Sequence, residues 1–138
     1  MSGGPRQRLH DERGAVLVAG LLLAIALLMV IGAAVDIGRA FIGRRELVSL
    51  ADEAALSGSQ ALDLDALHAG RLALDPNEAH ATALGVLGAE PKLRAQARAN
   101  PASVSVQVER RIPTVLLRLV GLSTLTVKAR ATAEPRAP

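Results

Sequence analysis

The stretch "AVLVAGLLLAIALLMVIGAAVDIGRAFIGRRELVSLADEAALSG", residues 15–58, decides the fold, because a long apolar segment continues into a polar one with no proline between them. Its first part, residues 15–35, has no charged or strongly polar side chain. At a helical rise of about 1.5 Å per residue this segment covers roughly 30 Å, the thickness of a bilayer's hydrocarbon core. The remaining chain is too small to cover every face of so apolar a helix. We therefore expect residues 15–35 to form a transmembrane helix.

Residues 36–62 are expected to extend the same helix into water as a stalk. Gly38, Gly43 and Gly58 weaken a helix without ending it. Small and apolar residues recur there at spacings of three and four, so they form one stripe along the helix. Small side chains let helices approach closely, and the pairs Gly20/Ala24 and Ala34/Gly38 show the same small-xxx-small spacing nearer the membrane. The predicted helix-packing residues are Leu47, Leu50, Ala51, Ala54, Ala55 and Gly58.

Two properties of the apolar segment stay open at this point. Gly32, Ala33 and Ala34 offer small residues at the spacing that signal peptidase recognises, although the segment is longer than the usual apolar region of a signal peptide. The positive-inside rule does not orient the span, because three arginines lie near each of its ends. Cleavage near Ala34 is therefore an alternative to a permanent anchor.

The rest of the chain predicts a small α+β head at residues 63–138. After a loop at residues 63–75, Asp75 is a good N-cap and Pro76 suits the first helical position, so a short helix is expected up to Gly88. Apolar and polar residues alternate over 103–112 and again over 125–134, which is typical of half-buried strands. A short apolar helix is predicted from Pro113 to Gly121. A two-stranded sheet is marginal alone, so we expect it to pack on the long helix or on the second one.

Composition and charge narrow the function classes. The chain has 138 residues, one aromatic side chain and no cysteine, so a disulfide framework and a thiolate metal site are excluded. Residues 36–91 carry a net charge of −5 and residues 92–138 a net charge of +7. Basic segments that bind nucleic acid usually carry stacking aromatics, which this one lacks. We expect the acidic and basic parts to attract each other, within one chain or between neighbours.

The sequence contains no pattern typical of an active site. The histidines are scattered, and no zinc, calcium, phosphate-loop or nucleophile-elbow spacing occurs. We therefore predict no enzyme activity, no catalytic or metal site, no cofactor and no small-molecule substrate. The carboxylate at the end of the apolar segment, Asp36, is expected at headgroup level, hydrated or paired with Arg39 three residues on.

Several motifs together resemble the TadE/TadG-like proteins of the tight-adherence (Flp) pilus assembly system. The N-terminal block is the most specific: Arg13-Gly14 before the span, Ala34-Val35-Asp36-Ile37-Gly38-Arg39 at its end, Arg45-Glu46-Leu47, and Ala51-Asp52-Glu53-Ala54-Ala55-Leu56. Asp75-Pro76, Ile112-Pro113-Thr114 and the closing strand are also similar. The membrane-boundary signature of the resemblance falls on Asp36, Gly38 and Arg39.

The resemblance implies a noncatalytic, pilin-like or assembly protein of the cell membrane. The implied organisation is a cytoplasmic tail at residues 1–14, the transmembrane helix at 15–35, the stalk at 36–62 and an extracytoplasmic head at 63–138. Its partners would be the membrane and other pilin-like or Tad assembly proteins, with lateral packing through the N-terminal helix and no nucleic acid. The alternative is a secreted binding or effector domain, released by cleavage near Ala34.

Overall fold

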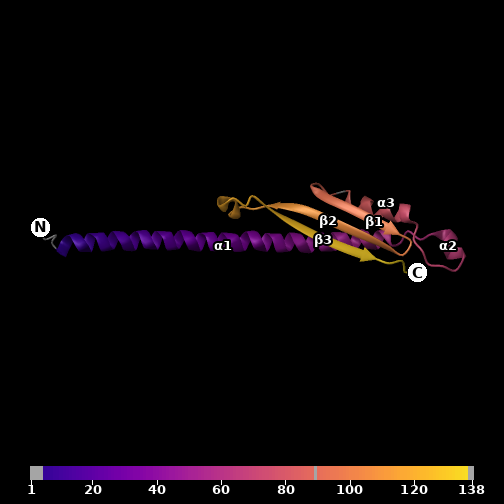
Figure 1. Cartoon of the computed structure of the whole chain (residues 1–138), viewed down its shortest axis with the longest axis horizontal. Helices are drawn as coiled ribbons and strands as arrows, with labels where there is room; N and C mark the ends of the chain where they lie inside the picture. The colour runs from indigo at the N-terminus through magenta and orange to yellow at the C-terminus, as the bar shows by residue number, and fades with distance from the viewer. Residues whose placement is uncertain (1–4, 89, 137–138) are drawn as a thin grey trace.

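The computed structural model describes residues 5–88 and 90–136, with side chains described from residue 13. One helix, α1 (Pro5–Gly58), runs through the predicted span and most of the predicted stalk, and the head is built on its C-terminal part (Figure 1). Its 54 residues give a rod of about 80 Å. The helix ends four residues before the predicted end of the stalk. Residues 1–4 of the predicted tail lie outside the described part of the chain.

The head contains two short helices, a 3₁₀ turn and three strands. In chain order these are α2 (Leu64–His68), α3 (Pro76–Leu87), β1 (Leu93–Asn100), β2 (Ser103–Pro113), η1 (Leu117–Val120) and β3 (Thr124–Ala133). Asp75 caps α3 as its sequence predicts, because its Oδ1 accepts hydrogen bonds from the N–H groups of Asn77 and Glu78 at 2.8 and 3.2 Å. Asp63 caps α2 in the same way, so part of the predicted loop at 63–75 is helical.

The α+β class is confirmed, but the prediction of a two-stranded sheet is wrong, because the sheet has three antiparallel strands in the order β1-β2-β3. The additional strand, β1, lies in the polar segment between Gly88 and residue 103, where no strand is predicted from the sequence. Its sequence does alternate, but the residues that face the core after Leu93 are Ala95, Ala97 and Ala99, and alanine is a weak strand former. The strand forms because it pairs with β2, where Ala97 lies opposite Val106.

The helix predicted from Pro113 to Gly121 is also wrong in extent. Pairing of β2 with β3 continues to Pro113, opposite Thr124, so only residues 114–123 remain for the connection. Within it the backbone forms the four-residue turn η1, and Gly121 closes the turn in the left-handed region at a φ of 90°. The N–H of Leu122 donates to the carbonyl of Leu117 at 3.0 Å, which returns the chain towards β3. We call residues 114–122 the hairpin tip.

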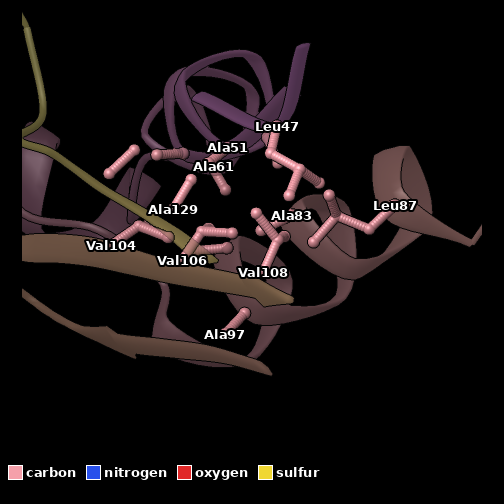
Figure 2. Close-up of a cluster of buried hydrophobic side chains, with 14 of the residues drawn as sticks. Leu47, Ala51, Ala61, Ala83, Leu87, Ala97, Val104, Val106, Val108 and Ala129 are labelled. Atoms are coloured by element: carbon pink, nitrogen blue, oxygen red, sulfur yellow. The ribbon is translucent and has the colours of Figure 1, made fainter. Parts of the chain in front are cut away.

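The core lies between the inner face of the sheet, α3 and the C-terminal part of α1 (Figure 2). Val104, Val106 and Val108 of β2 are fully buried and face Leu47 and the alanines of both helices. Alanine and glycine at the helix contacts bring backbones close together. A Cβ on Gly58 would lie 2.8 Å from the carbonyl oxygen of Ala79 in α3. The sheet therefore packs on the C-terminal part of α1, and this contact fixes the head to the helix.

Candidate functional site at the helix and hairpin junction

One face of α1 stays buried well beyond the predicted packing stripe. Gly32, Asp36, Gly43 and Leu47 follow one another at spacings of four, seven and four, which places them on the same side of a helix. All four are buried. Of the predicted helix-packing residues, Leu50 is half-buried and the others are buried against this chain's own head: Leu47, Ala51, Ala54, Ala55 and Gly58. The buried face thus reaches from the head to a point inside the predicted span.

Asp36 is the centre of this junction. It is only 2% exposed, although the helix around it is mostly exposed. Its Oδ1 accepts a hydrogen bond from the N–H of Val115 at 2.9 Å. Its Oδ2 accepts from the N–H groups of Leu116 and Leu117, both at 2.8 Å. These donors are free backbone groups at the start of η1, so the carboxylate caps a turn that is about eighty residues away in the chain.

The three N–H groups also favour the ionised form of the carboxylate. Hydrogen bonds from Leu117, then Val115 and Leu116, hold the pKa of Asp36 below its ordinary value of 3.8. The charge of Arg39 acts weakly in the same direction, whereas burial opposes it. Asp36 is the first residue beyond the predicted span, so it presents a fixed negative charge to the hairpin tip at neutral pH.

Two glycines leave room for the hairpin against α1. A Cβ on Gly32 would lie 2.6 Å from Cβ and 2.8 Å from Cγ of Leu116, so only glycine admits that leucine. Gly43 leaves room in the same way for the end of the Ile112 side chain. The hairpin of β2 and β3 therefore lies on α1 at Gly43, at Asp36 and at Gly32, and η1 is its far end (Figure 1).

The other two residues of the boundary signature do not take part in this junction. Gly38 and Arg39 are exposed, and a Cβ on Gly38 would meet open space. No ion pair between Asp36 and Arg39 occurs in the described part of the chain; the carboxylate accepts hydrogen bonds from three backbone N–H groups. Sequence reasoning singled out Asp36 but missed residues 115–117, because no local signal connects two segments so far apart.

The hairpin tip presents an apolar surface next to the apolar part of α1. Four of its large apolar side chains are more than half exposed: Val115, Leu119, Val120 and Leu122. Leu119 is 75% exposed, which is as much as the leucines of the predicted span. Thr114 fixes the base of the tip, because its N–H donates to the carbonyl of Ser123 at 3.1 Å and its hydroxyl to the carbonyl of Leu122.

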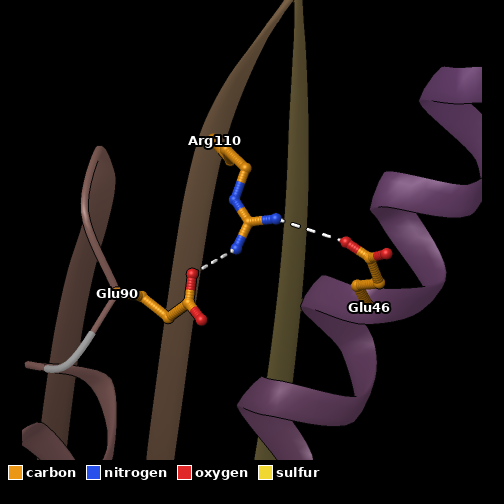
Figure 3. A network of polar contacts seen from close by, with 3 residues as sticks. All are labelled: Glu46, Glu90 and Arg110. Atoms are coloured by element: carbon orange, nitrogen blue, oxygen red, sulfur yellow. Dashed lines mark hydrogen bonds and ion pairs between the residues drawn. The ribbon is translucent and has the colours of Figure 1, made fainter.

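Arg110 joins the acidic and basic parts of the chain within the head (Figure 3). Its guanidinium lies 3.4 Å from Glu46 of α1 and 3.0 Å from Glu90, which precedes β1. Lys128 of β3 pairs with Glu109 of β2 at 3.3 Å. The glutamates are partly exposed, so each pair contributes little to stability on its own. Part of the attraction expected between the two charged regions thus acts within one molecule, through Arg110.

The described residues include no group of three or more His, Asp or Glu side chains that could hold a metal ion. Among them, one helix is long and apolar enough to cross a membrane, and the rest of the chain buries none of its most apolar stretch.

A comparison with protein families gives one match: the family described as Flp pilus-assembly TadE/G-like (Tad) matches residues 14–83. Searches of curated proteins and of solved structures give no significant match. The matched region contains the apolar segment, Asp36, the stalk and most of α3, whereas the sheet lies beyond it. The family and the apolar helix together indicate a membrane-anchored protein of pilus assembly. The match covers half of the sequence, and the chain belongs to the TadE/G-like family of Flp pilus-assembly proteins.

Proposed function

We propose that the chain is a noncatalytic, pilin-like or assembly component of a Flp/Tad-type pilus or secretion system. The observation that supports this most is the division of α1. Its C-terminal part packs in the core of the head, whereas residues 13–31 are exposed on all sides and almost entirely apolar. Such a surface is stable only in lipid or against other apolar helices. Deletion of the gene is expected to abolish or alter surface pili, and restoration of the full chain is expected to reverse the effect.

We further propose that residues 1–14 are cytoplasmic, that 15–35 cross the membrane, and that the stalk at 36–62 and the head at 63–138 are extracytoplasmic. Reporter fusions after Pro138 test this orientation. Alkaline phosphatase, which folds outside the cytoplasm, is expected to be active there, and a cytoplasmic reporter at the same position is expected to be inactive. The reverse pattern would contradict the proposal.

Lateral contacts with other pilin-like helices are proposed to use the part of α1 that the head leaves uncovered. The stripe from Leu47 to Gly58 is occupied by α3 and the sheet, so it has no free surface for a second helix. The pairs Gly20/Ala24 and Ala34/Gly38 have the small-xxx-small spacing that allows helices to approach, and Gly20 and Gly38 face open space.

A pair of glycine substitutions tests the lateral contact. Gly38→Leu adds a bulky side chain on the uncovered face, so it should reduce co-purification with pilus components without unfolding the head. Gly85→Leu is the control, because Gly85 of α3 also faces open space but lies on the head. If both variants assemble as the natural chain does, the lateral contact lies elsewhere.

The secreted alternative makes a different prediction for the mature chain. Cleavage near Ala34 would leave Asp36 as the second residue and would remove Gly32 from beneath Leu116. The intact mass distinguishes the two cases: a chain that retains residues 15–35 supports the anchor, whereas one that begins near Val35 supports release.

A further inference from the structure

We propose that the hairpin tip, residues 114–122, is a second membrane-contacting element, which inserts its apolar side chains into the outer part of the bilayer beside α1. The inference rests on the proposed membrane anchor. It adds that the head contacts lipid directly and at a fixed depth, through Val115, Leu119, Val120 and Leu122. The occupant of this exposed apolar surface is thus the acyl chains of the leaflet on the side of the head.

The position of the tip along α1 is the first argument. Leu116 is seated on Gly32, which lies three residues before the end of the predicted span. At the helical rise this is about 4.5 Å inside the apolar segment, one turn below its boundary. Peripheral apolar elements occupy a similar depth, between the headgroups and the acyl chains. Because Asp36 and Gly32 fix the tip to α1, insertion of the helix brings the tip to the same level.

The second argument is the chemistry of the tip surface. Leu119 is 75% exposed, and its neighbours Val120 and Leu122 are 54% and 53% exposed. In water such a cluster would be costly, whereas in the outer leaflet it continues the apolar surface of α1. Arg118 lies among these leucines and is exposed. A long arginine side chain can keep its stem along apolar surface while its guanidinium reaches lipid phosphates.

The third argument is the hydrogen bonding of the tip backbone. Even without the bonds internal to η1, seven of its nine N–H groups have a partner, namely those of residues 114–117, 119, 121 and 122. Backbone groups that leave water must be satisfied internally, which a surface loop in water does not require. Asp36 and the tip backbone satisfy each other. It supplies the acceptor for three N–H groups, and they in turn compensate a charge that would be costly at the membrane boundary.

The chain has no tryptophan, so single substitutions provide clean fluorescent reporters. Leu119→Trp places the reporter on the tip, at a site exposed enough to accept it. Leu64→Trp at the start of α2 is the matched control, a leucine 66% exposed on the head far from the tip. Leu22→Trp, at a leucine 60% exposed within the predicted span, reports the anchor itself. Each full-length variant is reconstituted into vesicles of phosphatidylcholine with a minority of phosphatidylglycerol.

Lipids brominated near the headgroup, or near the terminal methyl, then quench the reporters according to depth. We expect the Leu119→Trp variant to show blue-shifted emission and strong quenching by the shallow bromines, with weaker quenching by the deep ones. The Leu64→Trp variant should be unaffected by either lipid. The Leu22→Trp variant should be quenched, which establishes insertion of α1 independently of the tip.

Each other outcome overturns the inference in a recognisable way. If Leu22→Trp is quenched but Leu119→Trp behaves like Leu64→Trp, the anchor stands and the tip does not contact lipid. Blue-shifted emission of Leu119→Trp without quenching would mean that protein, such as a second copy of the chain, covers the tip. If Leu22→Trp itself escapes quenching, α1 does not enter the membrane and the proposed function fails together with the inference.

Discussion

The glycines of α1 fall into two sets, one covered by the rest of the chain and one open. Gly32, Gly43 and Gly58 lie on the face that the hairpin and α3 cover, and a Cβ on any of them would collide with a neighbouring atom. Gly14, Gly20 and Gly38 lie on the same helix, and a Cβ on each would meet nothing within 4 Å. The first set brings the head against the helix, whereas the second leaves a surface free. Small residues in one helix can therefore serve an internal and an external contact.

The largest loss of stability is expected where α1 packs into the core of the head. Leu47→Ala removes a fully buried side chain between α1, α3 and the sheet, so it should destabilise the head by about 3 kcal/mol. Val48→Ala, one residue on but 39% exposed, is the control and should cost less than about 1 kcal/mol. Hydrogen exchange of the β2 amides measures both changes. Equal effects of the two variants would mean that this face of α1 does not carry the head.

The glycines of the two sets should respond to alanine with opposite signs. Gly58→Ala brings a Cβ within 2.8 Å of the backbone oxygen of Ala79, which cannot rotate away, so a loss of roughly 2 kcal/mol is expected. Gly38→Ala meets no atom and removes the flexibility of glycine in a helix, so a gain of up to about 1 kcal/mol is expected. Unfolding in detergent, followed by the exchange of core amides, gives both values. If both substitutions increase stability, Gly58 does not lie in close contact with Ala79.

These contrasts also explain how much of the molecule could be predicted from its sequence. The apolar span, the cap at Asp75 and the alternating strands β2 and β3 depend on residues close together in the chain, so local pattern predicts them. The strand β1 depends on β2 for its partner, since its inward alanines give no strong signal of their own. The contact of Asp36 with residues 115–117 depends on the whole hairpin folding back along α1, and no local pattern encodes it.

Loss of Asp36 is expected to release the hairpin tip and leave the rest of the head in place. Asp36→Ala removes the acceptor of three N–H groups, so the exchange of the Val115, Leu116 and Leu117 amides should accelerate by roughly tenfold or more. The amides of β2 should be unchanged. Asp36→Asn keeps one acceptor oxygen, so its exchange rates at residues 115–117 should lie between those of the natural chain and those of Asp36→Ala. Unchanged protection at residues 115–117 in the alanine variant would mean that Asp36 does not hold the tip.

A smaller loss of stability is expected at Arg110, which forms ion pairs with Glu46 of α1 and with Glu90. Arg110→Gln breaks the contacts with Glu46 and Glu90, and since both glutamates are partly exposed, the loss should be about 1 kcal/mol or less. The difference between the two proteins should shrink as salt is added, because exposed ion pairs are screened. Lys128→Gln is the control and should cost less still, because Lys128 is more exposed than Arg110 and makes one ion pair instead of two. A loss independent of salt would point to packing of the arginine stem instead of its charge.

The smallest expected effect is that of mild acid on the tip. The pKa of Asp36 is lowered by the N–H groups of Leu117, Val115 and Leu116, so the folded state binds a proton less readily than the unfolded chain. The stability that this difference contributes is present above the ordinary value of 3.8, and it is lost only as the pH falls through the still lower pKa of the folded state. Exchange at residues 115–117, corrected for its intrinsic pH dependence, should therefore be unchanged between about pH 7 and pH 5. Release of the tip with a midpoint in that range would mean that protonation of Asp36 is favoured by the junction, and that its three hydrogen bonds do not form as described.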